Sequence, residues 1–515
     1  MVHLEPAPAR KKATSMQRRQ FLVTAIATTA LLAAVPAMAQ EPLSLKIGTT
    51  VEPRSFDPAQ AQEGTQIPYY QAVYDTLLLR EPDGSLSPML ATQWSYDDSF
   101  TTLTLTLRDD VTFSDGTTFD ADDVVASFAH FAQANGPQVN TVSSVKAVNA
   151  VSPTEVVIEL KEPDPAFLIY LSNAAGFMAS SESLGTESLV TTPVGSGPYL
   201  LDKDGTTVGS RYHFVRNEAY WGRKLPYDEV DFLVLSDETA RLNALRSGQV
   251  NTAIMSSAAA GAEAAKAGFT LVPNESDWHG LTFFDRAGTL NPALGDVRVR
   301  QAVNYALDRH LLLESFELGQ GSVTDQIWGK ASLGFVPELD EYYAYDPDRA
   351  RALLAEAGYG NGLKLTIPVT TIFDDATLVA VQQMLLDVGI EAEYQEIPLA
   401  DFFGELRSGK QGMTYMWFFQ PTDWQLINQF IAPDATWNVF DSSDDVIPGL
   451  MDKVQAGSDD DRRVAAQELN RHIVEQAWFA PLYRVVKQLF VDDKTTVVPQ
   501  AEQAAPSIYN YAPAS

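Results

Sequence analysis

Apolar and polar side chains alternate with a period of two over several short stretches of this chain, which is the pattern of half-buried strands. Residues 43–49 form the first such stretch. Residues 94–96 and 101–107 predict one hairpin, and residues 145–150 and 155–160 predict another, because each pair is separated by a short turn. We therefore expect antiparallel strand pairs in the first third of the chain.

Other stretches place apolar residues three and four positions apart, which predicts amphipathic helices. These helices are 66–79, one that opens at Asp120, 237–247, 297–311 and 347–356. The segment 363–397 combines both patterns, because a strand to 369, a helix over 376–387 and a strand from 390 follow one another. Such a crossover predicts a parallel strand pair. Strands interleaved with helices in this way predict the α/β class.

The first 39 residues have the pattern of an export signal. Two arginines at positions 18 and 19 precede an apolar run over 23–35, and an Ala-Met-Ala sequence ends it at Ala39. A basic start, a short apolar stretch and small residues at its end are the parts of a signal peptide. The paired arginines followed by Phe-Leu predict twin-arginine export, with a general secretory signal as the alternative. We predict cleavage after Ala39 and exclude residues 1–39 from the fold.

The composition favours a soluble protein that works outside the cytoplasm. The sequence has no cysteine, so it lacks the thiol to which a lipoprotein's lipid is attached. The formal net charge is −31, and such an acidic surface repels nucleic acid. We therefore predict a soluble, exported protein of the Gram-negative periplasm that is monomeric and does not bind nucleic acid.

Six segments carry recognisable motifs in a fixed order. Residues 193–199 (PVGSGPY) match the pattern PvGtGPY, and residues 296–309 (DVRVRQAVNYALDR) match d.rvRqAi.yAiDR. The other segments are 77–94, 103–125, 216–250 and 345–359. In these motifs the chain resembles the family 5 extracellular solute-binding proteins of ABC importers, whose members bind peptides, dipeptides or nickel. The resemblance covers essentially all of the chain after the leader.

The resemblance implies a periplasmic-binding-protein fold of type II, cluster C. In this fold two α/β lobes close on a ligand, and an extra subdomain is attached to the first lobe. The implied boundaries are 41–65, 192–279 and 482–515 for lobe one, 66–191 for the extra subdomain, and 280–481 for lobe two. The chain then crosses between the lobes near Gly280 and Pro481, where we expect hinges.

The main candidate binding residues lie in an aromatic stretch, residues 415–440. Trp417 and Trp424 are its candidates for the walls of a ligand site. In peptide-binding relatives an Asp of this stretch pairs with the α-ammonium of the ligand, and here Gln420 stands at that position. A neutral amide does not compensate a buried cation as a carboxylate does. Either Asp423 takes over the role, or the ligand has no free amine.

Further candidates lie elsewhere in the chain. The resemblance implies that Trp278 and His279 face the ligand and that Thr50, after the first strand, faces the cleft. Arg407 is a candidate partner for a ligand carboxylate. For the aromatic residues the alternative is packing in the core, and for Arg407 it is a solvated position at the end of a helix.

The sequence predicts neither a metal site nor a catalytic site. The six histidines are scattered without ligand spacing. The G-x-S-x-G, H-E-x-x-H and P-loop motifs are absent, so we predict no cofactor and no catalytic residue. Our hypothesis is that the protein is the substrate-binding component of an ABC importer. It captures a peptide and delivers it to a permease and its ATPase in the inner membrane. The alternatives are an oligosaccharide or sugar–amino acid conjugate, a metal chelate and, last, a secreted hydrolase.

Overall fold

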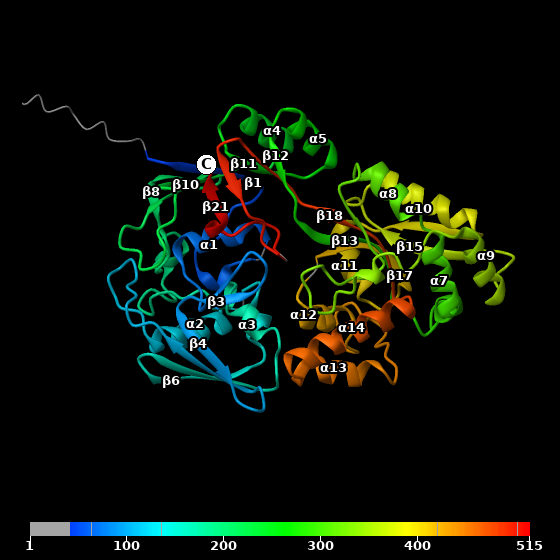
Figure 1. Ribbon diagram of the computed structural model, residues 1–515, viewed down its shortest axis with the longest axis horizontal. Coiled ribbons are helices and arrows are strands. Elements are labelled where there is room, and N and C mark those ends of the chain that lie inside the picture. The colour runs from blue at the N-terminus through cyan, green and yellow to red at the C-terminus, as the bar shows by residue number, and fades with distance from the viewer. Residues whose placement is uncertain (1–41, 63, 135, 420, 502, 515) are drawn as a thin grey trace, which may run out of the picture. The chain divides into compact units, whose positions relative to one another are not determined.

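The computed structural model describes residues 42–62, 64–134, 136–419, 421–501 and 503–514 (Figure 1). The predicted leader and Gln420 therefore lie outside the described residues. Within the described part of the chain, no helix is long and apolar enough to cross a membrane.

The largest sheet has seven strands in the order β12-β19-β11-β1-β10-β9-β8. Its first strand, β1 (Ser44–Thr49), is the predicted one, and it is parallel to both of its neighbours, β10 (Glu229–Val234) and β11 (Thr252–Met255). The outer strands, each antiparallel to its inner neighbour, are β8 (Tyr199–Thr207), β9 (Arg211–Arg216), β12 (Thr270–Val272) and β19 (Gln488–Val491). Two helices, α4 (Glu238–Arg246) and α5 (Ala258–Lys266), contact β11 of this sheet. The sheet thus joins segments from both ends of the chain.

A second sheet is antiparallel throughout and confirms both predicted hairpins. Its strands are β4 (Ala91–Tyr96), β5 (Thr102–Leu107), β7 (Glu155–Leu160) and β6 (Val145–Ser152), in that order. Helix α2 (Ala121–Gln133) begins at the predicted Asp120. The Asp120 carboxylate accepts the Asp122 N–H at 2.9 Å, and the Asp123 carboxylate accepts the Asp120 N–H at 3.0 Å, which closes a capping box.

A third sheet carries much of the candidate site. Its order is β14-β18-β13-β17, with β14 (Gly321–Val323), β18 (Phe479–Val486), β13 (Glu275–Phe283) and β17 (Met413–Phe419), all antiparallel. Beside it the predicted β-α-β crossover is confirmed, because β15 (Leu363–Val369) and β16 (Ile390–Glu396) are parallel and α10 (Asp375–Asp387) connects them.

Two predicted helices were too long. The helix predicted over 66–79 ends early, since α1 covers Ile67–Val73 and the chain then extends to pair β2 (Leu78–Arg80) with β3 (Leu86–Pro88). The helix predicted over 297–311 is divided into α7 (Val297–Ala306) and α8 (Arg309–Phe316). The division follows from Asp308, whose carboxylate caps the second helix by accepting the Leu311 N–H at 3.0 Å.

The remaining elements are mostly helical. They are α3 (Phe167–Tyr170), α6 (Pro292–Gly295), α9 (Pro347–Glu356), α11 (Leu399–Leu406), α12 (Asp423–Phe430), α13 (Ile447–Ala456), α14 (Asp459–Glu475), β20 (Thr495–Val497), β21 (Tyr511–Pro513), and 3-10 turns at Pro58–Gln60, Gly64–Gln66, Val139–Val142, Ala174–Gly176, Glu187–Val190, Pro337–Leu339 and Ile508–Asn510. Helix α9 confirms its predicted bounds.

The two segments that leave the third sheet toward the first run side by side. Gly280 of β13 and Pro481 of β18, where we expected hinges, are register partners inside the sheet rather than loop residues. The pairing continues past the strand ends, where the Lys487 N–H donates to the Asn274 carbonyl at 2.8 Å. Both chain segments therefore cross together near Asn274 and Lys487. The predicted domain boundaries remain a prediction.

Candidate functional site

Three of the predicted site residues, Thr50, His279 and Trp417, line a single cavity of about 380 Å³. We call this cavity the Trp417 pocket. Its other lining residues are Thr65, Ile254, Met255, Ser256, Ala258, Asp277, Glu317, Val485, Val486, Lys487, Gln488 and Ala504. Sites for small ligands commonly have volumes of about 300–1,000 Å³, so the pocket has the size of a small-molecule site.

Strand register explains why His279 and Trp417 meet there. The two residues are directly opposite in the antiparallel pair β13–β17. Residues opposite one another share a face of the sheet. Trp417 is 39% exposed, which is unusual for a tryptophan within a strand, while Phe418 next to it is buried. The pocket therefore has an indole surface available for contact.

The electrostatics of the sheet face are set by three polar side chains. The carboxylate of Asp277 forms an ion pair with Lys487, with 2.5 Å between Oδ2 and Nζ. His279 lies two positions further along β13, and burial lowers its pKa to about 4, with the Asp277 charge acting in the opposite direction. At neutral pH the His279 imidazole is therefore uncharged, and it can donate one hydrogen bond and accept another.

The opposite wall comes from the first sheet and is held by α4. The carboxylate of Glu238 accepts the backbone N–H groups of Ser256 and Ser257. Arg241, which is buried, donates to the Ile254 carbonyl and to the Ser256 hydroxyl, each at 2.7 Å. These bonds fix the turn after β11, where Ser256 borders the pocket.

Asp423 and Trp424 lie in another cavity, of about 340 Å³, which we call the Trp424 pocket. The carboxylate of Asp423 is already hydrogen-bonded within the protein. Its carboxylate accepts the Trp328 indole N–H at 3.0 Å, the Gly334 N–H at 2.7 Å and the Leu333 N–H at 2.9 Å. Burial nevertheless raises the pKa of Asp423 above its usual value. These contacts give Asp423 a structural role and do not support its use as the partner of a ligand amine.

The other predicted site residues have different outcomes. Trp278 was placed wrongly: it is 1% exposed and packs on Phe418 and Phe479, because successive residues of a strand point to opposite faces. Arg407 lies outside the pockets named here and donates to the Phe403 carbonyl of its own helix at 3.0 Å. Gln420 lies outside the described residues.

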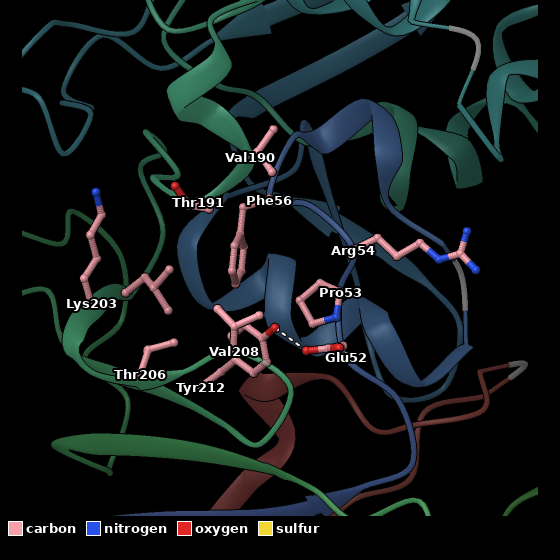
Figure 2. Close-up of a pocket in the computed structure, with 11 residues that line it drawn as sticks. Glu52, Pro53, Arg54, Phe56, Val190, Thr191, Lys203, Thr206, Val208 and Tyr212 are labelled. Carbon is pink, nitrogen blue, oxygen red and sulfur yellow. Dashed lines mark hydrogen bonds between the residues drawn. The ribbon is translucent and has the colours of Figure 1, made fainter.

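A third cavity, of about 310 Å³, has mainly apolar walls and contains none of the predicted site residues. Figure 2 shows it around Phe56 and Val208, with the side chains of Arg54 and Lys203 extending outward. Its carboxylate, Glu52, accepts a hydrogen bond from the Tyr212 hydroxyl at 2.5 Å. With this acceptor engaged, the cavity offers few polar groups to orient a ligand.

The residues of the Trp417 pocket that sequence reasoning missed include its charged side chains, Asp277, Glu317 and Lys487. Single charged residues carry no motif, and their common location depends on strands that are far apart in the chain. Among the described residues there is no group of three or more potential metal ligands.

Comparison with known proteins identifies the family. The model of the bacterial extracellular solute-binding proteins, family 5 (middle region), matches residues 85–434. The chain belongs to this family. The predicted resemblance is thereby confirmed, and the family 5 protein described here is a solute-binding component of an ABC importer.

Several curated relatives match most of this family 5 protein. The nickel-binding periplasmic protein of Escherichia coli is 26% identical over 432 residues, which cover 78% of this chain and 79% of that protein. A probable di/tripeptide-binding protein of Pseudomonas aeruginosa is 28% identical, covering 75% and 78%. A glutathione-binding protein of Escherichia coli is 30% identical, covering 73% of each. All three are named as binding proteins.

Solved structures confirm the predicted α/β periplasmic-binding-protein fold. HbpA2 from Haemophilus parasuis superimposes with a TM-score of 0.82 at 22% identity, covering 91% of this chain and 99% of that one. The binding protein AgaA from A. tumefaciens, in complex with agropinic acid, gives a TM-score of 0.71 at 26% identity, covering 92% and 99%.

Proposed function

We propose that this family 5 protein is a soluble, monomeric protein of the Gram-negative periplasm that captures a peptide in the Trp417 pocket. It then delivers the peptide to an ABC permease and its ATPase in the inner membrane. The supporting observation is the pair His279 and Trp417, which presents an exposed indole and a neutral imidazole in a cavity of ligand size. The relatives named for di/tripeptides and glutathione support a peptide as cargo.

The proposed site binds its ligand and does not transform it. This part of the proposal is supported by the curated relatives, which are named as binding proteins. The enzyme alternative predicts product formation, whereas the binding proposal predicts saturable affinity without turnover.

A second cargo class has its own support. The solved relative with agropinic acid is 26% identical to this chain, and a tryptophan surface suits a sugar–amino acid conjugate as well as a peptide. A nickel chelate is a further candidate from the nickel-binding relative.

Thermal-shift screening of the protein from residue 40 onward separates these candidates. The panel contains di- and tripeptides, glutathione, agropinic acid, maltotriose and a nickel–histidine chelate. A ligand at a hundredfold excess over its Kd stabilises the folded state by about 2.7 kcal/mol. Stabilisation by peptides supports the proposal. If only a ligand of another class stabilises the protein, that class replaces peptides as the proposed cargo. Hydrolysis of a panel member without any shift in melting temperature contradicts a binding role.

A further inference from the structure

Glu317 is a carboxylate in the Trp417 pocket for which the described residues provide no partner. It follows the last residue of α8, is half-buried, and lines the same cavity as Trp417 and His279. Among the contacts of the described residues, its side chain makes neither a hydrogen bond nor an ion pair.

In the part of the chain that the structure describes, no positive charge balances Glu317. The titratable groups that interact electrostatically with Glu317 are Asp374 at the start of α10, Tyr415 of β17 and Tyr483 of β18. Each of these side chains is acidic or neutral. The pocket's cation, Lys487, is already paired with Asp277. Burial, together with the Asp374 charge, raises the pKa of Glu317 to about 7.

An unpaired, partly buried carboxylate is unfavourable unless a cation accompanies it. The same cavity presents the face of an exposed tryptophan, the aromatic ring that attracts cations most strongly. The unpaired carboxylate and the exposed indole both favour a positively charged ligand group.

We propose that Glu317 binds a positively charged group of the ligand, an ammonium or a guanidinium, which also contacts the indole of Trp417. The inference rests on the proposed ligand site and deepens it, because it assigns the charge of the cargo. A peptide with a free amine or a basic side chain meets this requirement, and a neutral oligosaccharide does not.

The test uses amines and their N-acetyl derivatives as matched probes. Trialanine is compared with N-acetyltrialanine, spermidine with its triacetyl derivative, and agmatine with the N-acetylated urea analogue that replaces its guanidinium, so each comparator lacks the positive charge. Binding is measured by thermal shift and calorimetry at pH 8, at up to millimolar concentration. The protein variants are wild type, Glu317→Gln, and Glu314→Gln as control, since Glu314 lies in the last turn of α8, is exposed and does not line the pocket.

We expect at least one amine to bind wild type and the Glu314→Gln control alike. Both N-acetylation and Glu317→Gln should weaken binding by about tenfold or more. Affinity for the amine should also fall as pH drops below 7 in wild type and stay flat in Glu317→Gln, because protonated Glu317 no longer attracts a cation. Glu317→Gln retains the shape of the side chain, and an unchanged circular dichroism spectrum verifies its fold.

Three results overturn the assignment: equal affinity for an amine and its acetylated form, equal affinity of wild type and Glu317→Gln, or no binding by any of the amines. These results are distinguishable from failure of the peptide proposal. If acetylated trialanine binds as well as trialanine, peptide capture stands and the role of Glu317 is lost. If agmatine or spermidine binds through Glu317 while no peptide binds, Glu317 stands and peptides are excluded as cargo.

Discussion

His279 and Trp417 are register partners across β13 and β17, and both border the same cavity. The adjacent partners, Trp278 and Phe418, point to the other face, where they pack on each other with ring centroids 5.4 Å apart. The strand pair thus directs one tryptophan, Trp417, toward the Trp417 pocket and the other, Trp278, into the core.

Trp417→Ala should separate binding from stability. Loss of the exposed indole should weaken ligand binding by about 2 kcal/mol, roughly 30-fold. The free energy of unfolding should change by less than about 1 kcal/mol, because the side chain is already 39% exposed. Calorimetry measures the first quantity and denaturant titration the second.

Trp278→Ala is the matched control for that experiment. Trp278 is 1% exposed, so its truncation should destabilise the fold by about 3–5 kcal/mol. If Trp278→Ala instead left stability intact and abolished binding, the assignment of the two faces would be wrong.

His279 should make the protein sensitive to acid. Its pKa is lowered to about 4 in the folded protein, below the 6.5 of an unperturbed histidine. The unfolded chain therefore binds more protons between these values, and stability present above pH 6.5 is lost as pH falls toward 4. We expect the melting temperature of wild type to decline more steeply over this window than that of His279→Gln. Parallel curves for the two proteins would contradict the shift.

Part of this site could be predicted from the sequence, and particular residues show where the limit lies. Trp417 and His279, which border the Trp417 pocket, were proposed because they lie in segments that resemble a family. Trp278 was placed wrongly because a displacement of one residue along a strand exchanges the two faces. Glu317 was missed because an acidic residue at a helix end gives no pattern, and its surroundings come from β17 and β18, which lie much later in the chain.

In the fold, too, local features could be predicted from the sequence and long-range pairing could not. The strands of the hairpins and the β-α-β unit were predicted because their pairing is local. The division of the 297–311 helix was missed because apolar positions recur on both sides of the break at Leu307 and Asp308. The cap that restarts the helix is a single hydrogen bond. The joint crossing near Asn274 and Lys487 depends on a pairing between distant strands.

Asp423→Asn should act on stability rather than on ligand charge. The substitution places an amide where three N–H donors, from Trp328, Leu333 and Gly334, now share two carboxylate oxygens. Leaving one donor unsatisfied costs about 1–3 kcal/mol, so the midpoint of denaturant unfolding should fall. A normal midpoint combined with selective loss of amine-bearing ligands would show that Asp423 binds the ligand after all.

Glu317→Gln should stabilise the unliganded protein at alkaline pH. The folded pKa of Glu317 is about 7, above the ordinary 4.5, so its contribution to stability is fully present below pH 4.5 and is lost as pH rises through 7. The variant should therefore melt at the wild-type temperature at pH 4 and at a higher temperature at pH 8. Thermal scans at both values, with Glu314→Gln as control, provide the measurement.

Ligand binding should bring the two predicted lobes together. Because the sequence has no cysteine, introduced cysteines can be labelled specifically with dyes for fluorescence energy transfer. Val151 and Leu386 are 59% and 53% exposed and lie in the predicted extra subdomain and lobe two. Dyes on Val151→Cys and Leu386→Cys should therefore report closure, because family members of this fold close on their ligand by hinge motion. The control pair, Leu386→Cys with Val464→Cys, lies within predicted lobe two and should give a constant signal. A saturating ligand that changes neither pair would show that binding occurs without closure, and a change in the control pair would contradict the predicted domain boundaries.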